Sequence, residues 1–442
     1  MVFILHRHPV LPELSSFVQS KLIMSQQYSS DEAYFDNISF ALAEAGAYRP
    51  TLVVDKQRLD HNIDQLMSVT GSGFDYRIVA KSLPSLPMLK YIMARTGTNR
   101  LMSFHMPFLM HVVASIPKVD ILLGKPMPVH SVRLFYQWRK QNKIRFNQSR
   151  QLQWLVDSLE RLKQYEALAR ELRMVFNINL EIDIGLHRGG FACDENYRQA
   201  LALINESKSL RLSGLMGYEP HIGKIPLFLG GPTHAFRKAQ ADYCAFKEVI
   251  TDVMGTEALA GLTFNTGGST TYPLYTDSDK EGIVNELATA SALVKPTDFD
   301  VPTLKQHKNA AFIATPVLKV IDKPEIPMAR KLSKLMHTVG VLPSKSCFIY
   351  GGNWLAKPCY PAGSRCSELF GHSSNQEMYD LPNDSDIKMD DFMFFRPTQS
   401  EAVFLQFGEV AVYDEGKIVD WWSVFEPCHA KNAIIKTNPH PE

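Results

Sequence analysis

The chain has 442 residues, of which 45% are hydrophobic and 21% are charged, a composition typical of a globular protein that is long enough for two domains. Its 47 basic and 46 acidic residues nearly cancel, which argues against a nucleic-acid-binding surface and against a polybasic membrane patch. We therefore expect a small-molecule substrate as the partner, with no nucleic acid and no membrane.

The cysteines and the apolar segments indicate the cellular compartment. Six cysteines lie far apart and form no Cys-x-x-Cys pair, so the sequence predicts neither a zinc ribbon nor a disulfide framework. The apolar stretch near the N-terminus is too short for a secretory signal, and no later segment approaches the roughly 18 apolar residues of a membrane span. These features predict a cytoplasmic protein with reduced thiols.

From residue 51 onward, short apolar runs alternate with amphipathic stretches. TLVVD at 51–55 predicts a strand, and the following LDHNIDQLMSV predicts a helix because its apolar residues recur three and four positions apart. Eight further strands are predicted near 76–81, 101–104, 119–123, 143–147, 174–183, 211–218, 260–265 and 283–290. Because helical stretches lie between most of them, including SRQLQWLVDSLERLKQYEALARELR, we expect a parallel (β/α)8 TIM barrel over residues 51–305.

The pattern changes after about residue 305. Short runs rich in Val, Ile, Phe and Tyr, such as AAFIATPVLKVID, KLMHTVGV and KSCFIYGG, are separated by Gly, Asp and Pro. They predict a mainly antiparallel β domain over 306–442. The polar stretch 353–393 is expected to be a long loop. VYDEGKIVDWW predicts a hairpin that turns at 414–416.

Lys81 follows the apolar run of the first predicted barrel strand, in YRIVAKSLPS. It is either a surface lysine that marks where the strand meets solvent or an amine nucleophile able to form a Schiff base. In a TIM barrel the catalytic groups lie at the carboxyl ends of the strands. The barrel prediction therefore favours the nucleophile, although a surface lysine stays open.

Two more strand ends carry side chains suited to chemistry. In EIDIGLHRGGF, glycines surround Arg188, whose guanidinium suits an anionic oxygen. In GLMGYEPHIG, Tyr218 and His221 could stack on a ring or exchange a proton. The alternatives are a plain turn with a surface arginine and a polar strand end whose hydrogen bonds are satisfied.

The last two strands end in small residues. FNTGGSTTY places Gly267, Gly268 and Ser269 after the seventh barrel strand, where their backbone N–H groups and hydroxyls could hold a phosphate. NELATASALVKP places small residues around Ser291 after the eighth strand. A Gly-Gly turn is weak evidence alone, so its position carries the argument. A lysine, an arginine, an aromatic face and a phosphate nest are the parts that a pyridoxal phosphate site needs.

The order of these motifs resembles one known family. TLVVD, LDHNI, RIVAKS, EIDIGLHRGGF, GLMGYEPH, TGGST and ELATASALVKP resemble the alanine racemase-like, fold-type III enzymes that use pyridoxal phosphate, most closely the D-threonine aldolase and D-serine dehydratase branch. The resemblance implies a TIM barrel followed by a C-terminal β domain, with residues 1–50 packed partly on that β domain. It also implies a homodimer.

The resemblance also implies roles for particular residues. Lys81 would form the aldimine with pyridoxal phosphate, Arg188 would contact the cofactor's phenolic oxygen, and Tyr218 would line the pocket with His221 nearby. The residues expected at the phosphate are Gly267, Gly268, Ser269 and the backbone around Ser291. Lys81, Tyr218 and His221 are the expected catalytic residues.

One departure from the family concerns a metal. Metal-dependent members of the branch carry a His-x-Cys or His-x-Asp pair near the C-terminus, and the two positions are occupied here by Gln399 and Glu401. Glutamine is a poor zinc ligand, but Glu401 with another oxygen donor could hold a harder ion. A divalent metal is therefore left open, as is an acid/base role for Glu401.

The resemblance implies a lyase that acts on a D-amino acid, either a D-serine dehydratase-like or a D-threonine aldolase-like enzyme. An amino-acid racemase is the alternative, in which Tyr218, His221 or a residue of a second copy supplies a second acid/base. A non-catalytic protein of pyridoxal phosphate homeostasis is an alternative of another class. Such relatives are typically a lone barrel, so the predicted β domain argues against it.

Overall fold

The computed structural model describes residues 31–71, 73–275 and 283–425. The chain divides into two compact units. The barrel unit comprises Leu52–Ala311, Pro397–Val412 and Asp420–Glu442, and the β unit comprises Met1–Thr51, Phe312–Arg396 and Tyr413–Val419. The apolar N-terminal stretch, predicted to be too short for a secretory signal, lies outside the described residues.

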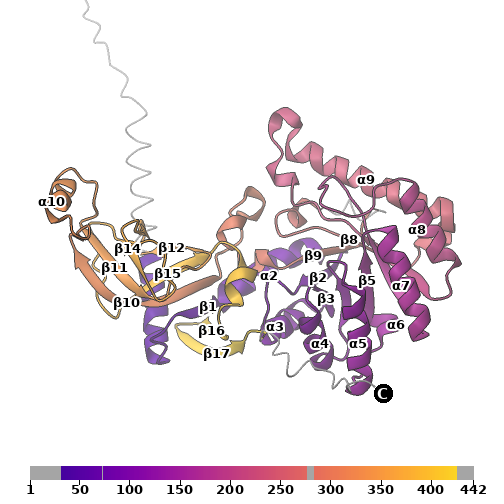
Figure 1. The fold of residues 1–442 in the computed structure, drawn as a ribbon, viewed down its shortest axis with the longest axis horizontal. Helices are drawn as coiled ribbons and strands as arrows, with labels where there is room; N and C mark the ends of the chain where they lie inside the picture. Colours follow the sequence, from indigo (N-terminus) through magenta and orange to yellow (C-terminus); the bar gives the residue numbers. More distant parts are fainter. Residues whose placement is uncertain (1–30, 72, 276–282, 426–442) are drawn as a thin grey trace, which may run out of the picture. The chain divides into compact units, whose positions relative to one another are not determined.

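The barrel unit is built on a closed parallel barrel, as the alternating pattern predicts (Figure 1). Its strands are β2 (Asp75–Val79), β3 (Arg100–Ser103), β4 (Asp120–Leu123), β5 (Leu152–Val156), β6 (Phe176–Glu181), β7 (Leu210–Met216), β8 (Thr263–Thr266) and β9 (Glu286–Thr289). Each pairs with the next, and β2 pairs with β9 to close the ring. All eight carboxyl ends therefore open at one face of the barrel.

Helix α2 leads from β1 into the barrel, and the helices after it connect the barrel strands and lie outside them (Figure 1). They are α2 (Lys56–Thr70), α3 (Leu86–Thr96), α4 (Met106–Ser115), α5 (Val129–Gln141), α6 (Gln148–Gln151), α7 (Leu159–Leu172), α8 (Glu195–Glu206) and α9 (Gly231–Met254). Local sequence sets their starts, since Asp55 caps α2 by accepting from Arg58 N and Ser85 caps α3 by accepting from Met88 N. The predicted helix after TLVVD is confirmed.

One predicted barrel strand is wrong. Residues 143–147 are not a strand, and the fourth barrel strand is β5, within the stretch assigned to a long helix. All five residues of β5 are buried. Because Gln153 is polar, the sequence pattern is that of an amphipathic helix. The Gln153 amide donates to Thr263 Oγ1 at 3.1 Å and accepts from Asn179 at 3.1 Å. These hydrogen bonds let a polar side chain lie inside the barrel.

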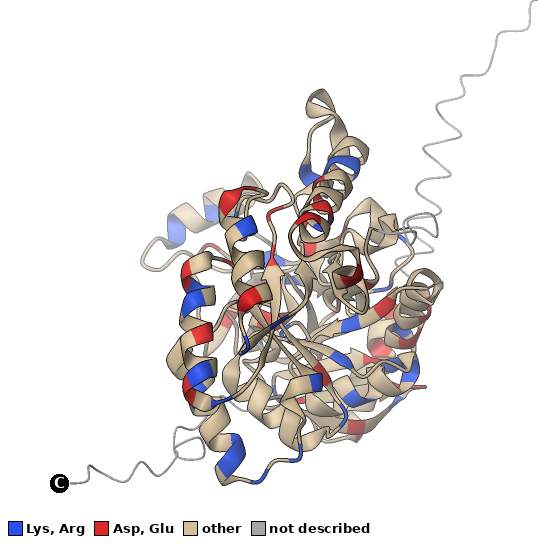
Figure 2. Ribbon diagram, turned by 90° about the vertical axis from the view of Figure 1, so that its right-hand side faces the viewer, with Lys and Arg blue, Asp and Glu red and all other residues tan. Residues whose placement is uncertain are grey.

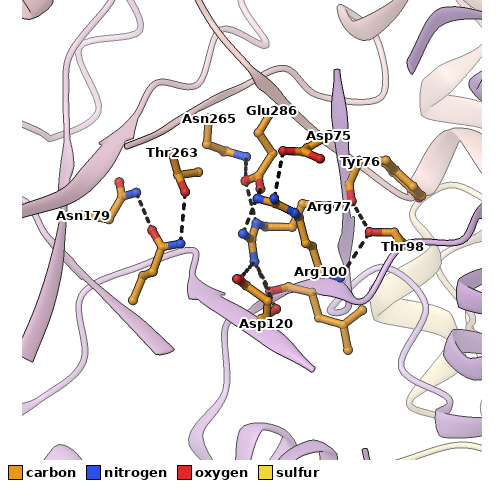
Figure 3. Close-up of polar contacts among 12 residues, drawn as sticks. Asp75, Tyr76, Arg77, Thr98, Arg100, Asp120, Asn179, Thr263, Asn265 and Glu286 are labelled. Carbon is orange, nitrogen blue, oxygen red and sulfur yellow. Dashed lines mark hydrogen bonds and ion pairs between the residues drawn. The ribbon is translucent and has the colours of Figure 1, made fainter. Parts of the chain in front are cut away.

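A charged network fills the barrel interior near the strand beginnings (Figure 3). Arg77 of β2 is fully buried, and its Nε and Nη2 donate to the two oxygens of Glu286 at 2.6 and 2.8 Å. Its Nη1 lies 2.8 Å from Asp120 Oδ1, and Arg100 Nη1 lies 2.7 Å from Glu286 Oε2. Burial pushes the pKa of Glu286 upward, but the two arginines outweigh it and hold that pKa below its usual value.

The remaining strands form a nine-stranded, mainly antiparallel sheet with the order β13-β14-β11-β10-β1-β16-β17, in which β15 pairs with β10 and β12. The strands are β1 (Thr51–Asp55), β10 (Ala311–Asp322), β11 (Lys345–Tyr350), β12 (Ala356–Tyr360), β13 (Arg365–Cys366), β14 (Gln376–Asp380), β15 (Phe392–Pro397), β16 (Glu409–Asp414) and β17 (Lys417–Ser423). Strand β1 thus belongs to this sheet and not to the barrel. The predicted β16–β17 hairpin is confirmed.

Two features of this region differ from the prediction. The stretch 353–393, expected to be a long loop, contains β12, β13 and β14. KLMHTVGV is not a β run, because its first half lies in helix α10 (Arg330–Thr338). Leu332, Leu335 and Met336 recur at helical spacing there. A short helix, α11 (Ser400–Phe404), precedes β16.

In the β unit, a helix over residues 31–44 packs against the sheet. The Phe35 ring lies 5.3 Å from that of Phe312 and 4.7 Å from that of Phe394, measured between centroids. Both partners are buried sheet residues. This segment therefore contributes aromatic area to the core of the β unit.

Charge and thiols in the structure agree with the composition. Figure 2 shows basic and acidic residues interspersed along the helices. The five cysteines of the described residues are free thiols, whereas Cys428 lies outside them. No helix in the described part of the chain combines the length and apolar content that crossing a membrane requires.

Candidate active site

A pocket opens at the carboxyl ends of the barrel strands and encloses about 710 Å³ of empty space, its mouth included. A pocket at this face of a barrel is where the small-molecule sites of such folds lie. Residues as far apart in the sequence as Val79 and Glu401 meet in its wall. Eight residues singled out from the sequence line it: Lys81, Arg188, Tyr218, Gly267, Gly268, Ser269, Ser291 and Glu401.

Lys81 reaches the pocket from the turn that follows β2. Its Nζ lies 3.2 Å from Glu401 Oε1 and 5.2 Å from the centroid of the Phe104 ring. The side chain is 44% exposed, so burial is not what makes this lysine unusual. A carboxylate and an aromatic face instead direct an accessible amine into the pocket.

Arg188 stands in the turn after β6, with its guanidinium carbon 5.1 Å from the centroid of the Tyr218 ring. Asp183 builds that turn, because its carboxylate accepts from the backbone N–H groups of Gly185 and His187, each at 3.0 Å. Burial raises the pKa of Tyr218, although Arg188 acts in the opposite direction. The Tyr218 phenol is therefore protonated at neutral pH, and Arg188 is the cation on this wall.

The glycine-rich segment after β8 forms another wall. Gly267 has φ +89°, in the left-handed region that favours glycine. A Cβ atom at position 268 would lie 3.0 Å from Tyr218 Cε2, so glycine allows this backbone to approach the ring. Within the described part of the chain, no partner is found for the N–H groups of Gly268 and Ser269. The Ser269 hydroxyl accepts from Ala292 N and pairs with Thr289, linking the segment to the end of β9.

Glu219, to which the sequence pattern assigned no role, organises this wall. Its side chain is fully buried. It accepts hydrogen bonds from Thr266 Oγ1 at 2.7 Å, Thr271 Oγ1 at 3.0 Å and Tyr275 OH at 3.2 Å. The Gly267 N–H also points to it, at 3.4 Å. The hydroxyl-rich stretch after Gly267 was the available signal, because a carboxylate at the end of the neighbouring strand β7 can gather such donors.

Two predicted residues do not line the pocket. His221 Nε2 lies 3.3 Å from where a Cβ of Gly185 would be, and no partner for the buried His221 Nδ1 is found among the described residues. Burial lowers the His221 pKa, which keeps the imidazole neutral. Gln399 donates to Asp298 Oδ2 at 3.1 Å. Of the two positions compared with the family's metal pair, only Glu401 therefore faces Lys81.

The residues present fit pyridoxal phosphate. The cofactor needs an amine for its aldehyde, donors for its phosphate and a wall for its flat ring. Lys81 supplies an accessible amine, and the unpaired N–H groups of Gly268 and Ser269 supply donors of the kind that cradle phosphate. Tyr218, packed between Gly268 and Arg188, supplies the flat face.

Comparison with known proteins supports this assignment. The family model described as alanine racemase, N-terminal domain, matches residues 54–280. No curated protein sequence matches the chain significantly.

A D-threonine aldolase from Filomicrobium marinum is 14% identical, with a TM-score of 0.67 over 85% of this chain and 94% of that one. A D-threo-3-hydroxyaspartate dehydratase from Delftia sp. HT23 is 17% identical, with a TM-score of 0.61 over 86% and 98%. An alanine racemase of Clostridium difficile 630 is 12% identical, with a TM-score of 0.60 over 85% and 98%. At these identities the likeness establishes the fold.

Proposed function

Because the chain belongs to the alanine racemase N-terminal domain family, whose fold-type III members use pyridoxal phosphate, we propose that it is a pyridoxal phosphate-dependent lyase acting on a D-amino acid. The reaction is that of a D-serine dehydratase-like or a D-threonine aldolase-like enzyme. The observation that carries the proposal is the contact of 3.2 Å between Lys81 Nζ and Glu401 Oε1 in the pocket. It places an amine and a carboxylate side by side.

Three parts of the pocket would hold the cofactor. Lys81 would bind it covalently, the backbone of Gly267 to Ser269 with that around Ser291 would hold its phosphate, and Arg188 with Tyr218 would contact its ring. When bound, pyridoxal phosphate supplies an electron-poor ring that stabilises negative charge at the Cα of an amino acid. Glu219 is a positioning residue, because it fixes the segment that carries the phosphate donors.

The proton movements are assigned to Lys81 and Glu401. Lys81 Nζ takes the proton from the substrate's Cα in dehydration, since it is the accessible amine in the pocket. The proton taken from Cα passes from Nζ to the Glu401 carboxylate beside it, which gives it to the β-hydroxyl as that group leaves as water. In aldol cleavage the same carboxylate would take the proton of the β-hydroxyl. Exposure of Lys81 to the pocket mouth allows protons to exchange with solvent.

The pocket favours a lyase over a racemase. Racemisation in both directions needs a second group on the opposite face of Cα that both gives and takes a proton. Burial raises the pKa of Tyr218 and so disfavours its proton-accepting form, and His221 does not line the pocket. A racemase would therefore need a residue from a second copy of the chain. The fold likeness to an alanine racemase keeps this reaction as the alternative to test.

The experiment is a substrate screen with the purified protein. Absorbance of the lysine-bound cofactor is measured first in the wild type and in Lys81→Ala, with Lys90→Ala as the exposed-lysine control. D- and L-amino acids are then assayed for 2-oxo acid, aldehyde and enantiomer formation, with and without divalent metals. We expect 2-oxo acid or aldehyde from D-amino acids with a β-hydroxyl. Racemisation without either product would overturn the lyase assignment, and a colourless protein would overturn the cofactor.

The same preparation addresses two further proposals. A bound cofactor without turnover of any amino acid would indicate the non-catalytic homeostasis role. We also propose the homodimer that the family resemblance implies, and sedimentation of the holoprotein measures it. A monomer across the micromolar range would contradict that oligomeric state without affecting the lyase proposal.

A further inference from the structure

Three potential metal ligands meet in the β unit, outside the candidate active site. They are Cys366, His372 and Glu377, whose ligand atoms all lie within 4.8 Å of one another. Among the described residues this is the one such group of three. Neither the lyase proposal nor the family's paired metal positions uses any of them.

The three residues belong to one hairpin. Cys366 ends β13 and pairs with Tyr379 of the antiparallel strand β14. Glu377 precedes Tyr379 by two positions, so its side chain projects on the same face of β14. His372 lies in the connection between the two strands. Strand register therefore brings together ligands that are five and eleven positions apart in the sequence.

The distances are close to those of a tetrahedral site. Cys366 Sγ lies 3.8 Å from His372 Nδ1 and 3.9 Å from Glu377 Oε1. Ligand bonds of about 2.3 Å to sulfur and about 2.0 Å to nitrogen or oxygen separate such atoms by about 3.5 Å. His372 Nδ1 and Glu377 Oε1 are hydrogen-bonded at 2.6 Å, so an ion must part them by under about 1 Å. The His372 side chain is 69% exposed and has room to move.

Glu377 is held in place by a second set of contacts. Its Oε2 accepts from Asn353 N at 2.8 Å and from Tyr379 OH at 2.7 Å, which leaves Oε1 directed at the cysteine and the histidine. Glu377 is only 1% exposed. A Cβ at Gly352 would lie 2.3 Å from Glu377 Cβ, so glycine lets the neighbouring chain enclose the carboxylate. Outer contacts of this kind orient metal ligands in proteins.

From this geometry we propose that Cys366, His372 and Glu377 bind one zinc ion per chain. A sulfur, an imidazole nitrogen and a carboxylate oxygen form a ligand set that zinc accepts, whereas magnesium and calcium prefer oxygen alone. The fourth position is left for water. The ion ties the two strands of the hairpin to the connection between them and stabilises the β unit.

A reactive, redox-sensing thiol is the competing interpretation of Cys366. Reactive thiols stand beside cations that stabilise the thiolate, whereas a carboxylate oxygen of Glu377 lies 3.9 Å from Cys366 Sγ. Three different ligand types directed at one point therefore suit an ion better than a redox reaction.

Zinc binding to the full-length holoprotein tests the proposal. The reduced protein is freed of metal, dialysed against zinc alone and analysed for bound metal. We expect one zinc per chain and a rise in melting temperature on zinc addition. Cys366→Ser and His372→Asn should each weaken binding by at least about 100-fold. Because His372 is exposed, His372→Asn folds even if Cys366→Ser does not.

Two control variants and a spectrum make the result specific. Cys359→Ser removes another β-unit thiol, whose Sγ contacts Phe394 O instead, and Glu401→Gln removes the pocket carboxylate; both should retain zinc. Cobalt(II) in place of zinc should give a thiolate-to-metal absorption band that Cys366→Ser lacks. The proposal is overturned if the wild type retains no zinc, if His372→Asn binds it as the wild type does, or if Glu401→Gln alone loses it.

Discussion

Arg77 and Lys81 are four residues apart, yet one cation is buried and the other is exposed. Arg77, within β2, is fully buried and its guanidinium contacts Glu286 and Asp120. Lys81, just beyond the end of β2, is 44% exposed, and its one carboxylate contact within residues 31–71, 73–275 and 283–425 is with Glu401. The same strand thus delivers one cation to the packed interior and another to the pocket.

Because of this difference in burial, we expect Arg77 to contribute to the stability of the fold and Lys81 to contribute to the reaction. A buried ion pair whose donors are all satisfied resists change, because removing one partner leaves an unpaired charge in a low dielectric. An exposed amine with one partner is free to change partners during a reaction. Losses at Arg77 should therefore appear as unfolding, and losses at Lys81 as inactivity.

Removal of the pocket lysine has the largest expected effect. Lys81→Ala should lower turnover by more than about 10³-fold, because no other group supplies the same amine. Its unfolding free energy should change by less than about 0.5 kcal/mol, as at other exposed positions. Steady-state assays and urea denaturation measure the two quantities. Substantial unfolding of Lys81→Ala would remove the contrast with Arg77.

The buried network provides the opposite case. Glu286→Gln leaves Arg77 with an uncompensated charge and should destabilise the protein by about 3–5 kcal/mol. Asp75→Asn is the matched control, since Asp75 contacts Arg100 at the rim of the same network with a half-exposed side chain. That change should cost less than about 1 kcal/mol. Equal urea midpoints for the two variants would contradict the assignment.

Glu401 is tested by separating two proton transfers. Glu401→Gln should lower product formation by about 10²-fold, because a neutral amide cannot donate a proton to the leaving hydroxyl. Exchange of the substrate's α-hydrogen in deuterated water should persist, because Lys81 performs it. Gln399→Ala, which removes a contact with Asp298 instead, should keep most of the turnover. If Glu401→Gln loses hydrogen exchange as well as product formation, Glu401 is needed for the proton transfer at Cα that is assigned here to Lys81.

His307 gives a second test of how burial of a titratable group affects stability, with a smaller expected effect than at Glu286. It pairs with Tyr272 OH at 2.8 Å, and burial, with Lys295 and His61 nearby, lowers its pKa from 6.5 to about 4. As the pH falls below 6.5 the unfolded chain gains a proton first, so stability declines down to pH 4 and is then constant. Allowing for solvent screening, we expect a loss of about 2 kcal/mol. His307→Gln should remove this part of the pH dependence. If that variant loses the same stability between pH 6.5 and pH 4, another group causes the decline.

The smallest expected effect concerns the phosphate wall. Gly268→Ala places a methyl group 3.0 Å from the Tyr218 ring and should weaken cofactor binding by about tenfold through displacement of the segment. Gly223→Ala is the control, because a Cβ there meets no atom within 4 Å. Cofactor titration followed by absorbance measures both. Unchanged affinity in Gly268→Ala would show that this backbone does not hold the phosphate.

Much of the architecture could be predicted from local patterns. The alternation of strands and helices led to the barrel, and strand ends that carry Lys81, Arg188 and Gly267 pointed to one face. The pattern failed where side chains broke the expected polarity, as at Gln153, which is polar but lies inside the barrel. It also failed at α10, whose apolar residues were assigned to a strand.

The sequence by itself determined the family, the barrel and eight of the residues that line the candidate pocket, because parallel strands bring their carboxyl ends to one face whatever lies between them. Only the tertiary structure decided how those residues contact one another. It paired Lys81 with Glu401, gathered donors around Glu219 and placed His221 away from the pocket lining. It also joined Cys366, His372 and Glu377 through strand register. These contacts depend on packing between distant segments, which no local pattern of residues contains.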